Sequence, residues 1–412
     1  MLTGQNGILT QAQNASTQTE IAEAKEKAQM DIMAWQSERL ENGQDATLND
    51  ETVKTILTGK DYVKELKDTS FISTKGEHEI QYSDLYTNGN NQSGQTVVDG
   101  VTIPSGFTHI VGDRKEEGIV VADSKGNEFV WVPVTKKEDG TATDPYVATN
   151  GMLTKKDGTQ VEIQLGRYEF DRTTGEPTTA PSGYSEDTAT NHNPDYGNAI
   201  ALSIENFKTS VEENGGYYIA RYEAGVTSDT PFDISDLTGG YLAPNDTWTA
   251  YDGDSSDIVI KSGEKVWNYV TQKKASELCI NLKTSNGYTD ITSDLVNSYA
   301  WDTALVFIQK CGTDSNYANQ IGLSTTPDNP SNLGEAILAR GNGKDKADVQ
   351  CNIYDMAGNC GEWTTETCSD SGYPCVSRGG SYYLSYGFTS LRGISIPTNA
   401  YVDSAFRPLL YL

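Results

Sequence analysis

The first forty residues constrain the fold of this chain more than any other feature. From about Ile8 to about Leu40 there is neither proline nor glycine, and the segment is rich in the helix formers Ala, Glu, Gln and Lys. Apolar side chains recur at three- and four-residue steps, which gives one narrow stripe of Ile21, Ala24, Ala28, Ile32 and Trp35. At about 1.5 Å per residue the helix would be about 50 Å long. The pattern therefore predicts a long packing helix or a coiled-coil segment.

Beyond this segment the pattern changes to that of a mixed domain. Residues 46–96 hold a short amphipathic stretch and a polar run, NGNNQSGQ, and we interpret them as a connector module. From Val97 onward β-branched and aromatic runs predominate, and residues 118–134 are split by a Lys-Gly-Asn turn that is typical of a hairpin. We expect an α+β fold with a domain over residues 97–412.

Further elements are expected inside that domain. The pattern predicts a strand at 215–225, a strand pair at 161–170 and helices near 268–282 and 294–310. The second helix is expected to bury one set of large side chains: Leu295, Ala300, Trp301, Leu305 and Phe307.

Charge and histidine content exclude several function classes. The chain has 31 Lys+Arg against 58 Asp+Glu, a formal net charge of -27. A surface this acidic repels phosphate backbones and anionic lipid. We therefore expect no nucleic-acid partner. The three histidines, His78, His109 and His192, are far apart in sequence and form no paired zinc motif.

The six cysteines all lie in the last third of the chain, and no CxxC pair occurs. They are either buried free thiols or disulfides of a secreted protein. The best candidate pair is Cys368 and Cys375, because the intervening Gly-Tyr-Pro turn could bring them together. The other four, Cys279, Cys311, Cys351 and Cys360, allow three further pairings, among which the sequence does not choose.

No run of about 18 apolar residues occurs, so the sequence contains no transmembrane span and no complete secretory signal. The opening LTGQNGILTQAQNA and the helix after it resemble type IV prepilin-like proteins of Gram-positive bacteria just after their hydrophobic segment. The resemblance implies that a membrane-spanning half has been removed before Met1. It also implies an anchored, extracellular protein at the bacterial surface, with pilus or pseudopilus subunits as partners.

Three segments share a second resemblance. They are GGYYIARYEAG (215–225), NIYDMAGNCGEW (352–363) and RGGSYY (378–383), with SAFRPLLYL (404–412) at the end. Together they resemble the formylglycine-generating-enzyme (sulfatase-modifying factor) branch of the C-type lectin fold. The residues that match its motifs are Asp355, Met356, Ala357, Gly358, Asn359, Glu362, Trp363, Arg378, Gly379, Gly380, Ser381, Phe406 and Arg407. The resemblance implies that these residues build the fold.

The chemistry of that family tests an enzymatic interpretation. Its oxygen-using members require two reactive cysteines beyond the Gly-Gly-Ser strand, because thiolates bind the copper. Here those places hold Leu384 and Thr389, and no cysteine follows Cys375. The His-x3-His-x-Glu iron site of another relative is also missing. We therefore expect a binding protein without enzymatic activity.

The region 381–404 has a composition typical of a binding surface. It is rich in Tyr, Ser and Gly, as antibody paratopes are, and contains no Lys, Glu, Gln, Met or Trp. This region resembles the variable region of proteins that diversity-generating retroelements diversify. Those elements mutate adenines, and mutation of the adenines in AAC or AAT codons for Asn never produces a codon for any of those five residues. The resemblance implies eleven varied, ligand-binding positions: Tyr383, Leu384, Tyr386, Gly387, Gly393, Ile394, Ser395, Ile396, Tyr401, Val402 and Asp403.

The sequence thus predicts a surface-displayed receptor or adhesin for an unknown protein or glycan, tethered by residues 1–45. The alternative is a non-variable minor pilin or structural surface subunit. No cofactor is expected, although DGDSSD (252–257) has calcium-like Asp spacing without the later Glu of an EF-hand.

Overall fold

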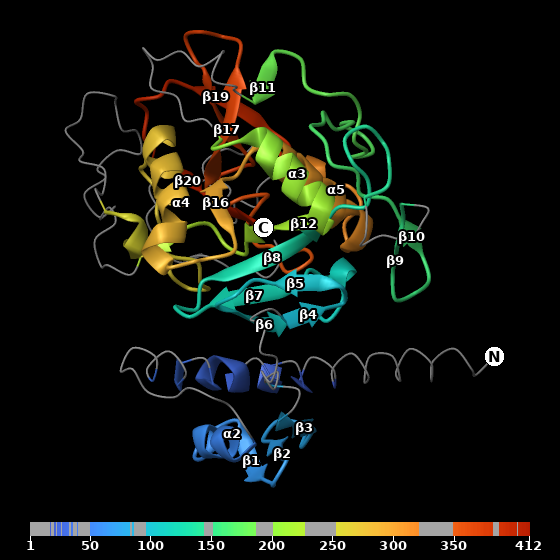
Figure 1. Ribbon diagram of the computed structural model, residues 1–412, viewed down its shortest axis with the longest axis vertical. Coiled ribbons are helices and arrows are strands. Elements are labelled where there is room, and N and C mark those ends of the chain that lie inside the picture. Colours follow the sequence, from blue (N-terminus) through green and yellow to red (C-terminus); the bar gives the residue numbers. More distant parts are fainter. Residues whose placement is uncertain are drawn as a thin grey trace, which may run out of the picture. The chain divides into compact units, whose positions relative to one another are not determined.

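The computed structural model describes most of the chain (Figure 1). The described residues are part of 17–39, then 50–82, 85, 96–143, 151–186, 201–226, 253–320, 349–381, 387–401 and 403–412. The chain divides into two compact units. The first comprises Met1–Gly94 with two short stretches, Thr108–Ile110 and Ser124–Gly126, and the second comprises the remainder.

The first unit is a helix packed with a small antiparallel sheet. Every described residue between 17 and 39 is helical. The helix shares a buried core with the elements that follow it, through Ala24, Ala28 and Ile32. Those elements are α2 (Asp50–Leu57) and the three strands β1 (Val63–Leu66), β2 (Ser70–Ser73) and β3 (Glu79–Gln81), paired in that order.

Polar contacts reinforce this packing. Asp31 accepts a hydrogen bond from Tyr62 at 2.6 Å and pairs with the Lys60 ammonium at 2.5 Å. Glu20 and His78 are 3.0 Å apart. The helix that we expected to form a separate region at 1–45 therefore shares one unit with the module at 46–96. Among the described residues, no helix is both long enough and apolar enough to span a bilayer.

A six-stranded sheet lies at the centre of the second unit, in the order β16-β21-β12-β8-β7-β6. The hairpin predicted at 118–134 is confirmed, since Val121 pairs with Phe129 in antiparallel register. The C-terminal strand lies between two strands from the middle of the chain. The bounds are β6 (Phe107–Val111), β7 (Val120–Asp123), β8 (Glu128–Pro133), β12 (Gly216–Ala220), β16 (Thr292–Leu295) and β21 (Pro408–Tyr411).

Three helices flank the strands of this unit (Figure 1). They are α3 (Ile204–Asn214), α4 (Gln272–Asn286) and α5 (Ser298–Cys311). α3 packs on β12 and β21, α5 on β8, and α4 on β16. Each helix begins with a side chain that accepts a backbone N–H: Ser203, Thr271 and Asn297 respectively. All five residues that the second predicted helix was expected to bury are fully buried, but Leu295 lies on β16 rather than on the helix, which begins at Ser298.

The second large sheet carries the C-terminal region. β17 (Gly361–Cys368) and β18 (Cys375–Arg378) form a hairpin, with β11 (Tyr184–Glu186) beside β17 and β19 (Arg392–Ser395) beside β18. β20 (Ser404–Phe406) pairs with β17 in parallel, whereas the other pairings in this sheet are antiparallel. The described structure is thus mixed α and β, as expected, and its sheets are mostly antiparallel.

Short pairings complete the unit. They are β4 (Thr96–Val98) with β5 (Val101–Ile103), β9 (Leu153–Thr154) with β10 (Gln160–Val161), and β13 (Gly225–Val226) between β14 (Ile258–Val259) and β15 (Lys265–Val266). The strand pair predicted at 161–170 is wrong. Only Val161 of these residues belongs to a strand, β10. The backbone after it bonds to other parts of the chain: Thr135 Oγ1 accepts from the Ile163 N–H at 2.7 Å, the Leu165 N–H donates to the Lys136 carbonyl at 2.9 Å, and Asp302 accepts from the Tyr168 N–H at 2.8 Å.

Candidate functional site

A buried ion-pair network fixes the sheet that carries the proposed binding region. Arg378 on β18 donates to Asp302 of α5 at 2.5 Å, and Arg392 on β19 donates to the other Asp302 oxygen at 2.6 Å. Glu366 on β17 accepts from Arg392 at 2.9 Å and from Arg167 at 2.7 Å. Because every charge has an opposite partner inside the protein, the network holds three strands and a helix in one geometry.

A second ion pair joins the two most informative motifs. Glu362 and Arg407 are fully buried, and the guanidinium donates to both carboxylate oxygens, at 2.9 Å from Nε and 2.5 Å from Nη2. Arg407 also donates to the carbonyls of Ala220 and Tyr354, at 2.8 Å each. The C-terminal segment is thereby bound to the strand at 215–225 and to the DMAGN loop.

The DMAGN loop closes tightly, as its small residues predict. Asp355 and Asn359 both have left-handed backbones, with φ of 63° and 62°. Glu223 accepts from the Cys360 N–H at 3.0 Å and from the Asn359 side chain. Burial, followed by the negative charges of Glu362 and Asp355, raises the pKa of Glu223 well above its ordinary value. Through these hydrogen bonds the buried Glu223 carboxyl ties the strand at 215–225 to the DMAGN loop.

The residues expected to build the fold are in the interior. Trp363, Gly380 and Phe406 are buried, and the Trp363 indole donates to the Val270 carbonyl at 2.7 Å. Gly379 has a φ of 81°, and a Cβ there would lie 2.8 Å from the Met356 carbonyl. These contacts confirm that the motif residues make the scaffold.

Two of the eleven predicted ligand-binding side chains are clearly exposed. Ile394 on β19 and Tyr401 in the following loop each keep 43% of their surface accessible. The backbone of Tyr401 is nevertheless fixed, because its carbonyl accepts from the Tyr269 N–H at 3.0 Å. Asn399 donates to the Tyr401 hydroxyl and to Ser395 Oγ, the latter at 3.0 Å. We call the surface formed by Gly393, Ile394, Ile396, Asn399 and Tyr401 the C-terminal face.

The other predicted positions divide into three groups. Gly393 and Ile396 are half-buried, and a Cβ at Gly393 would lie 2.7 Å from Ser377 Oγ, a hydroxyl that can rotate away. Gly387 and Ser395 are buried, and Asp403 is half-buried and accepts from Ser381 Oγ at 2.9 Å. Gly387 and Ser395 therefore do not belong to an exposed surface, which corrects our expectation for these two positions. Tyr383, Leu384, Tyr386 and Val402 lie outside the described residues.

One of the two positions that would carry thiols in oxygen-using relatives lies within the described residues. Thr389 is fully buried, and its N–H and hydroxyl donate to the Gln320 carbonyl at 2.9 and 3.3 Å. Leu384 lies outside the described residues. Over the part of the chain that the structure describes, no group of three His, Cys, Asp or Glu side chains could hold a metal ion.

The calcium-like run has a structural role in its described part. Asp254 accepts from the Ser256 N–H at 2.7 Å, and Asp257 accepts from the Asp254 N–H at 3.0 Å. The two carboxylates thus form a capping box on the short helix η4 (Ser255–Asp257). Asp252 lies outside the described residues.

The predicted Cys368–Cys375 disulfide is not formed, and no two of the six cysteines are bonded to each other in this structure. Cys375 pairs across the hairpin with Thr367. Since neighbouring residues of a strand point to opposite faces, Cys368 lies on the face away from Cys375. Accordingly, Cys375 is fully buried in the main core whereas Cys368 is half-buried.

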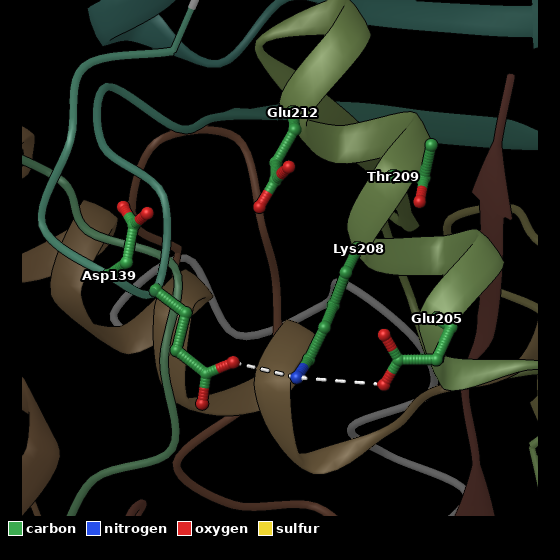
Figure 2. Close-up of a pocket in the computed structure, with 6 residues that line it drawn as sticks. Asp139, Glu205, Lys208, Thr209 and Glu212 are labelled. Atoms are coloured by element: carbon green, nitrogen blue, oxygen red, sulfur yellow. Dashed lines mark hydrogen bonds and ion pairs between the residues drawn. The ribbon is translucent and has the colours of Figure 1, made fainter.

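An acidic hollow of about 370 Å³ lies between α3 and the loop at 138–139 (Figure 2). Lys208 extends across it to Glu138 at 2.6 Å and to Glu205 at 4.0 Å, and its ammonium lies 4.4 Å from the centre of the Tyr299 ring. Among the described residues that line the hollow, Lys208 is the only one with an ammonium group, and it is already paired. The hollow therefore belongs to the acidic surface.

Comparison with known proteins gives limited similarity. No protein family and no curated protein matches the sequence. Among solved structures, one titled "Crystal Structure of CarF" is 17% identical with a TM-score of 0.28, covering 48% of this chain and 86% of its own. Treponema denticola variable protein 1 is 15% identical with a TM-score of 0.28, covering 48% and 85%. TM-scores this low do not establish a shared fold.

Proposed function

We propose that this protein is a ligand-binding receptor or adhesin displayed on a bacterial surface, with a C-type lectin domain whose C-terminal face is diversified by a retroelement. One observation carries the proposal. Ile394 and Tyr401 are exposed side chains on fixed backbone: Ile394 lies on β19, whose Arg392 is in buried ion pairs, and the Tyr401 carbonyl accepts from the Tyr269 N–H. Exposed apolar groups on a rigid support are typical of an interaction site.

The arrangement also suits diversification. A change at Ile394 or Tyr401 alters the surface without removing a core contact, whereas core substitutions commonly destabilise a protein. The composition of residues 381–404, which lack Lys, Glu, Gln, Met and Trp, is what adenine mutagenesis of Asn codons would leave. The ligand would be a protein or glycan that buries the Tyr401 ring.

We propose binding without catalysis for this face. The two positions at which oxygen-using relatives need thiols are Leu384 and Thr389. An aliphatic side chain and a hydroxyl bind copper poorly compared with two thiolates. Peptide-cysteine oxidation with stoichiometric copper bound at this face would contradict the proposal.

The alternative function, a non-variable minor pilin or structural subunit, is favoured by the first unit. There a helix packs on a three-stranded antiparallel sheet through an apolar stripe. In the preferred proposal the same unit tethers the binding domain. The two functions differ in whether the C-terminal face accepts new side chains and new ligands.

A library experiment distinguishes them. Gly393, Ile394, Ile396 and Tyr401 would be randomised together in the whole chain, displayed on phage and selected against a protein that the parent does not bind. The proposal predicts specific binders whose thermal midpoints lie within a few degrees of the parent's. A matched library would randomise Val111 and Leu202, which are exposed elsewhere on the second unit. Folded variants with no binders from the first library, or equal yields from both, would contradict a dedicated binding face.

A further inference from the structure

Two cysteines from distant parts of the sequence lie beside one cavity of the second unit. Cys311 is the last residue of α5, and Cys351 lies in the segment before the DMAGN loop. Both line a cavity of about 600 Å³. A Cβ placed on Gly312 would be 3.5 Å from Cys351 Sγ. The thiol of Cys351 therefore lies next to the backbone that carries Cys311.

Hydrogen bonds hold the two segments together. Gln350 Oε1 accepts from the Thr313 N–H at 2.9 Å and from the Thr313 hydroxyl at 3.2 Å. Thr313, two residues after Cys311, and Gln350, directly before Cys351, are thus joined by hydrogen bonds. The helix itself ends just there, where the Gly312 N–H donates to the Ile308 carbonyl at 2.7 Å.

The local backbone gives no reason of its own for a cysteine at position 351. Gln350 and Ile353 exchange both backbone hydrogen bonds, at 3.0 and 2.9 Å, around a two-residue turn. Cys351 and Asn352 have φ of 48° and 63°, as both central residues of such a turn require. Asn and Gly adopt this conformation readily, whereas cysteine does so rarely. A role for the thiol would account for its presence.

The turn is also held in place from its other side. The Asn352 side chain donates to the Gly118 carbonyl at 2.8 Å and to the Glu117 carbonyl at 3.1 Å. Gly118 approaches the turn so closely that a Cβ there would lie 2.0 Å from the Cys351 carbonyl oxygen. Both cysteines therefore lie on fixed backbone, which limits how far their thiols can separate.

We propose that Cys311 and Cys351 form a disulfide bond that ties the end of α5 to the turn before the DMAGN loop. The oxidant would be an external disulfide, either a small molecule such as oxidised glutathione or a protein disulfide. One cysteine thiolate attacks a sulfur of that disulfide and expels a thiolate. The second cysteine thiolate then attacks the mixed disulfide and expels the other. Two protein thiols thus lose two protons and two electrons, and the external disulfide is reduced to two thiols.

The surroundings indicate when the bond forms. Burial raises the pKa of Cys311 to about 12, with Lys155 lowering it and Glu116 raising it by smaller amounts. Burial, followed by the nearby Cys311, raises the pKa of Cys351 well above its ordinary value. The thiolate is the reacting species, and the raised pKa values leave little of it in the folded protein. Thiol–disulfide exchange at these two cysteines is therefore slow once the protein is folded and fast while it is folding.

The test uses the whole chain, refolded in a glutathione redox buffer. Free thiols would be alkylated under denaturing conditions, and the digest compared by mass spectrometry before and after reduction. We expect one cross-linked peptide that joins Cys311 to Cys351, with the remaining cysteines alkylated. Reduction should lower the thermal midpoint of the second unit by about 5–10 °C, because the bond limits the unfolded chain.

Three variants assign the effect. Cys311→Ser and Cys351→Ser should each abolish the dependence of the thermal midpoint on reductant. Cys368→Ser, at a half-buried cysteine elsewhere, should retain it. The wild-type peptide map does not depend on whether the variants fold. Alkylation of both Cys311 and Cys351 in protein with the native thermal midpoint, a bond to a different cysteine, or zinc bound by the two thiols would each overturn the proposal.

Discussion

Individual buried charges in this protein are stabilised by partners that are also buried. Glu362 and Arg407 have no exposed surface, so neither could remain charged there without the other. Glu366 and Asp302 likewise accept from Arg378, Arg392 and Arg167. Removal of one member is therefore expected to cost far more than loss of an exposed pair.

The Glu362–Arg407 pair gives a direct prediction. Arg407→Met should lower the free energy of unfolding of the second unit by about 3–5 kcal/mol, because it leaves a buried carboxylate unpaired. The double variant with Glu362→Leu should recover part of that loss, measured by denaturant titration. Lys310→Met, which removes the half-exposed pair with Glu176, should cost less than about 1 kcal/mol. Equal losses in the free energy of unfolding for Arg407→Met and Lys310→Met would refute this interpretation.

Asp294 predicts how stability depends on pH. Burial raises its pKa from 3.8 to about 7, with a smaller contribution from Glu186, although the N–H groups of Leu202 and Leu295 act against it. A raised acid pKa means that the folded state binds the proton more tightly than the unfolded state. This stabilisation is complete below pH 4, falls as the pH approaches 7 and is absent above it, a change of about 4 kcal/mol.

The measurement compares wild type with Asp294→Asn, whose side chain does not titrate. The difference in free energy of unfolding between the two proteins should shift by this amount between pH 4 and pH 8, in favour of the variant at the higher pH. All other titrating groups are common to both proteins and cancel. Parallel pH profiles would show that Asp294 does not titrate in this range.

At the scale of elements, some patterns predicted the structure and others did not. The hairpin around Lys125-Gly126-Asn127 was predicted because β-branched residues flank a turn sequence. Helix α3 was missed, although its signals are present: Ser203 caps its start and Gly215 ends it with a φ of 71°. The strand pair at 161–170 was wrong because this segment bonds to distant parts of the chain, both to backbone such as the Lys136 carbonyl and to side chains such as Asp302 and Thr135, which no local pattern reveals.

The N-terminal helix gives a prediction at this scale. Ile32 is 2% exposed and packs in the core of the first unit. Ile32→Ala should lower the free energy of unfolding of that unit by about 2–5 kcal/mol, because it removes buried methyl groups. Calorimetry should show the transition of the second unit unchanged. Met30→Ala, at a side chain that is 63% exposed on the same helix, serves as the control.

The outcome bears on the organisation of the chain. Loss of stability in both units would contradict their independence. Likewise, deletion of residues 1–45 should expose the apolar side chains of Val53, Leu57 and Phe71 in the first unit and leave the melting of the second unit nearly unchanged.

For the whole molecule, the sequence predicted the kind of structure better than the arrangement of its binding residues. The α+β composition and the buried roles of Trp363 and Phe406 follow from local patterns and motifs. The ion pairs that fix the sheet join residues as distant as Arg167 and Glu366, so they depend on tertiary structure. For the same reason the sequence could not show that Ser395 and Gly387 are buried while Ile394 and Tyr401 are exposed.

The central claim is that the C-terminal face varies on a constant scaffold, and sequencing the gene from many cells of the source population tests it most directly. The account predicts substitutions at adenines of a matching template repeat, concentrated in codons for exposed or half-buried positions such as Ile394, Ile396 and Tyr401. It predicts no substitutions in the codons for 355–363 and 404–412. Invariant codons across 381–404, or substitutions spread evenly over both regions, would contradict it.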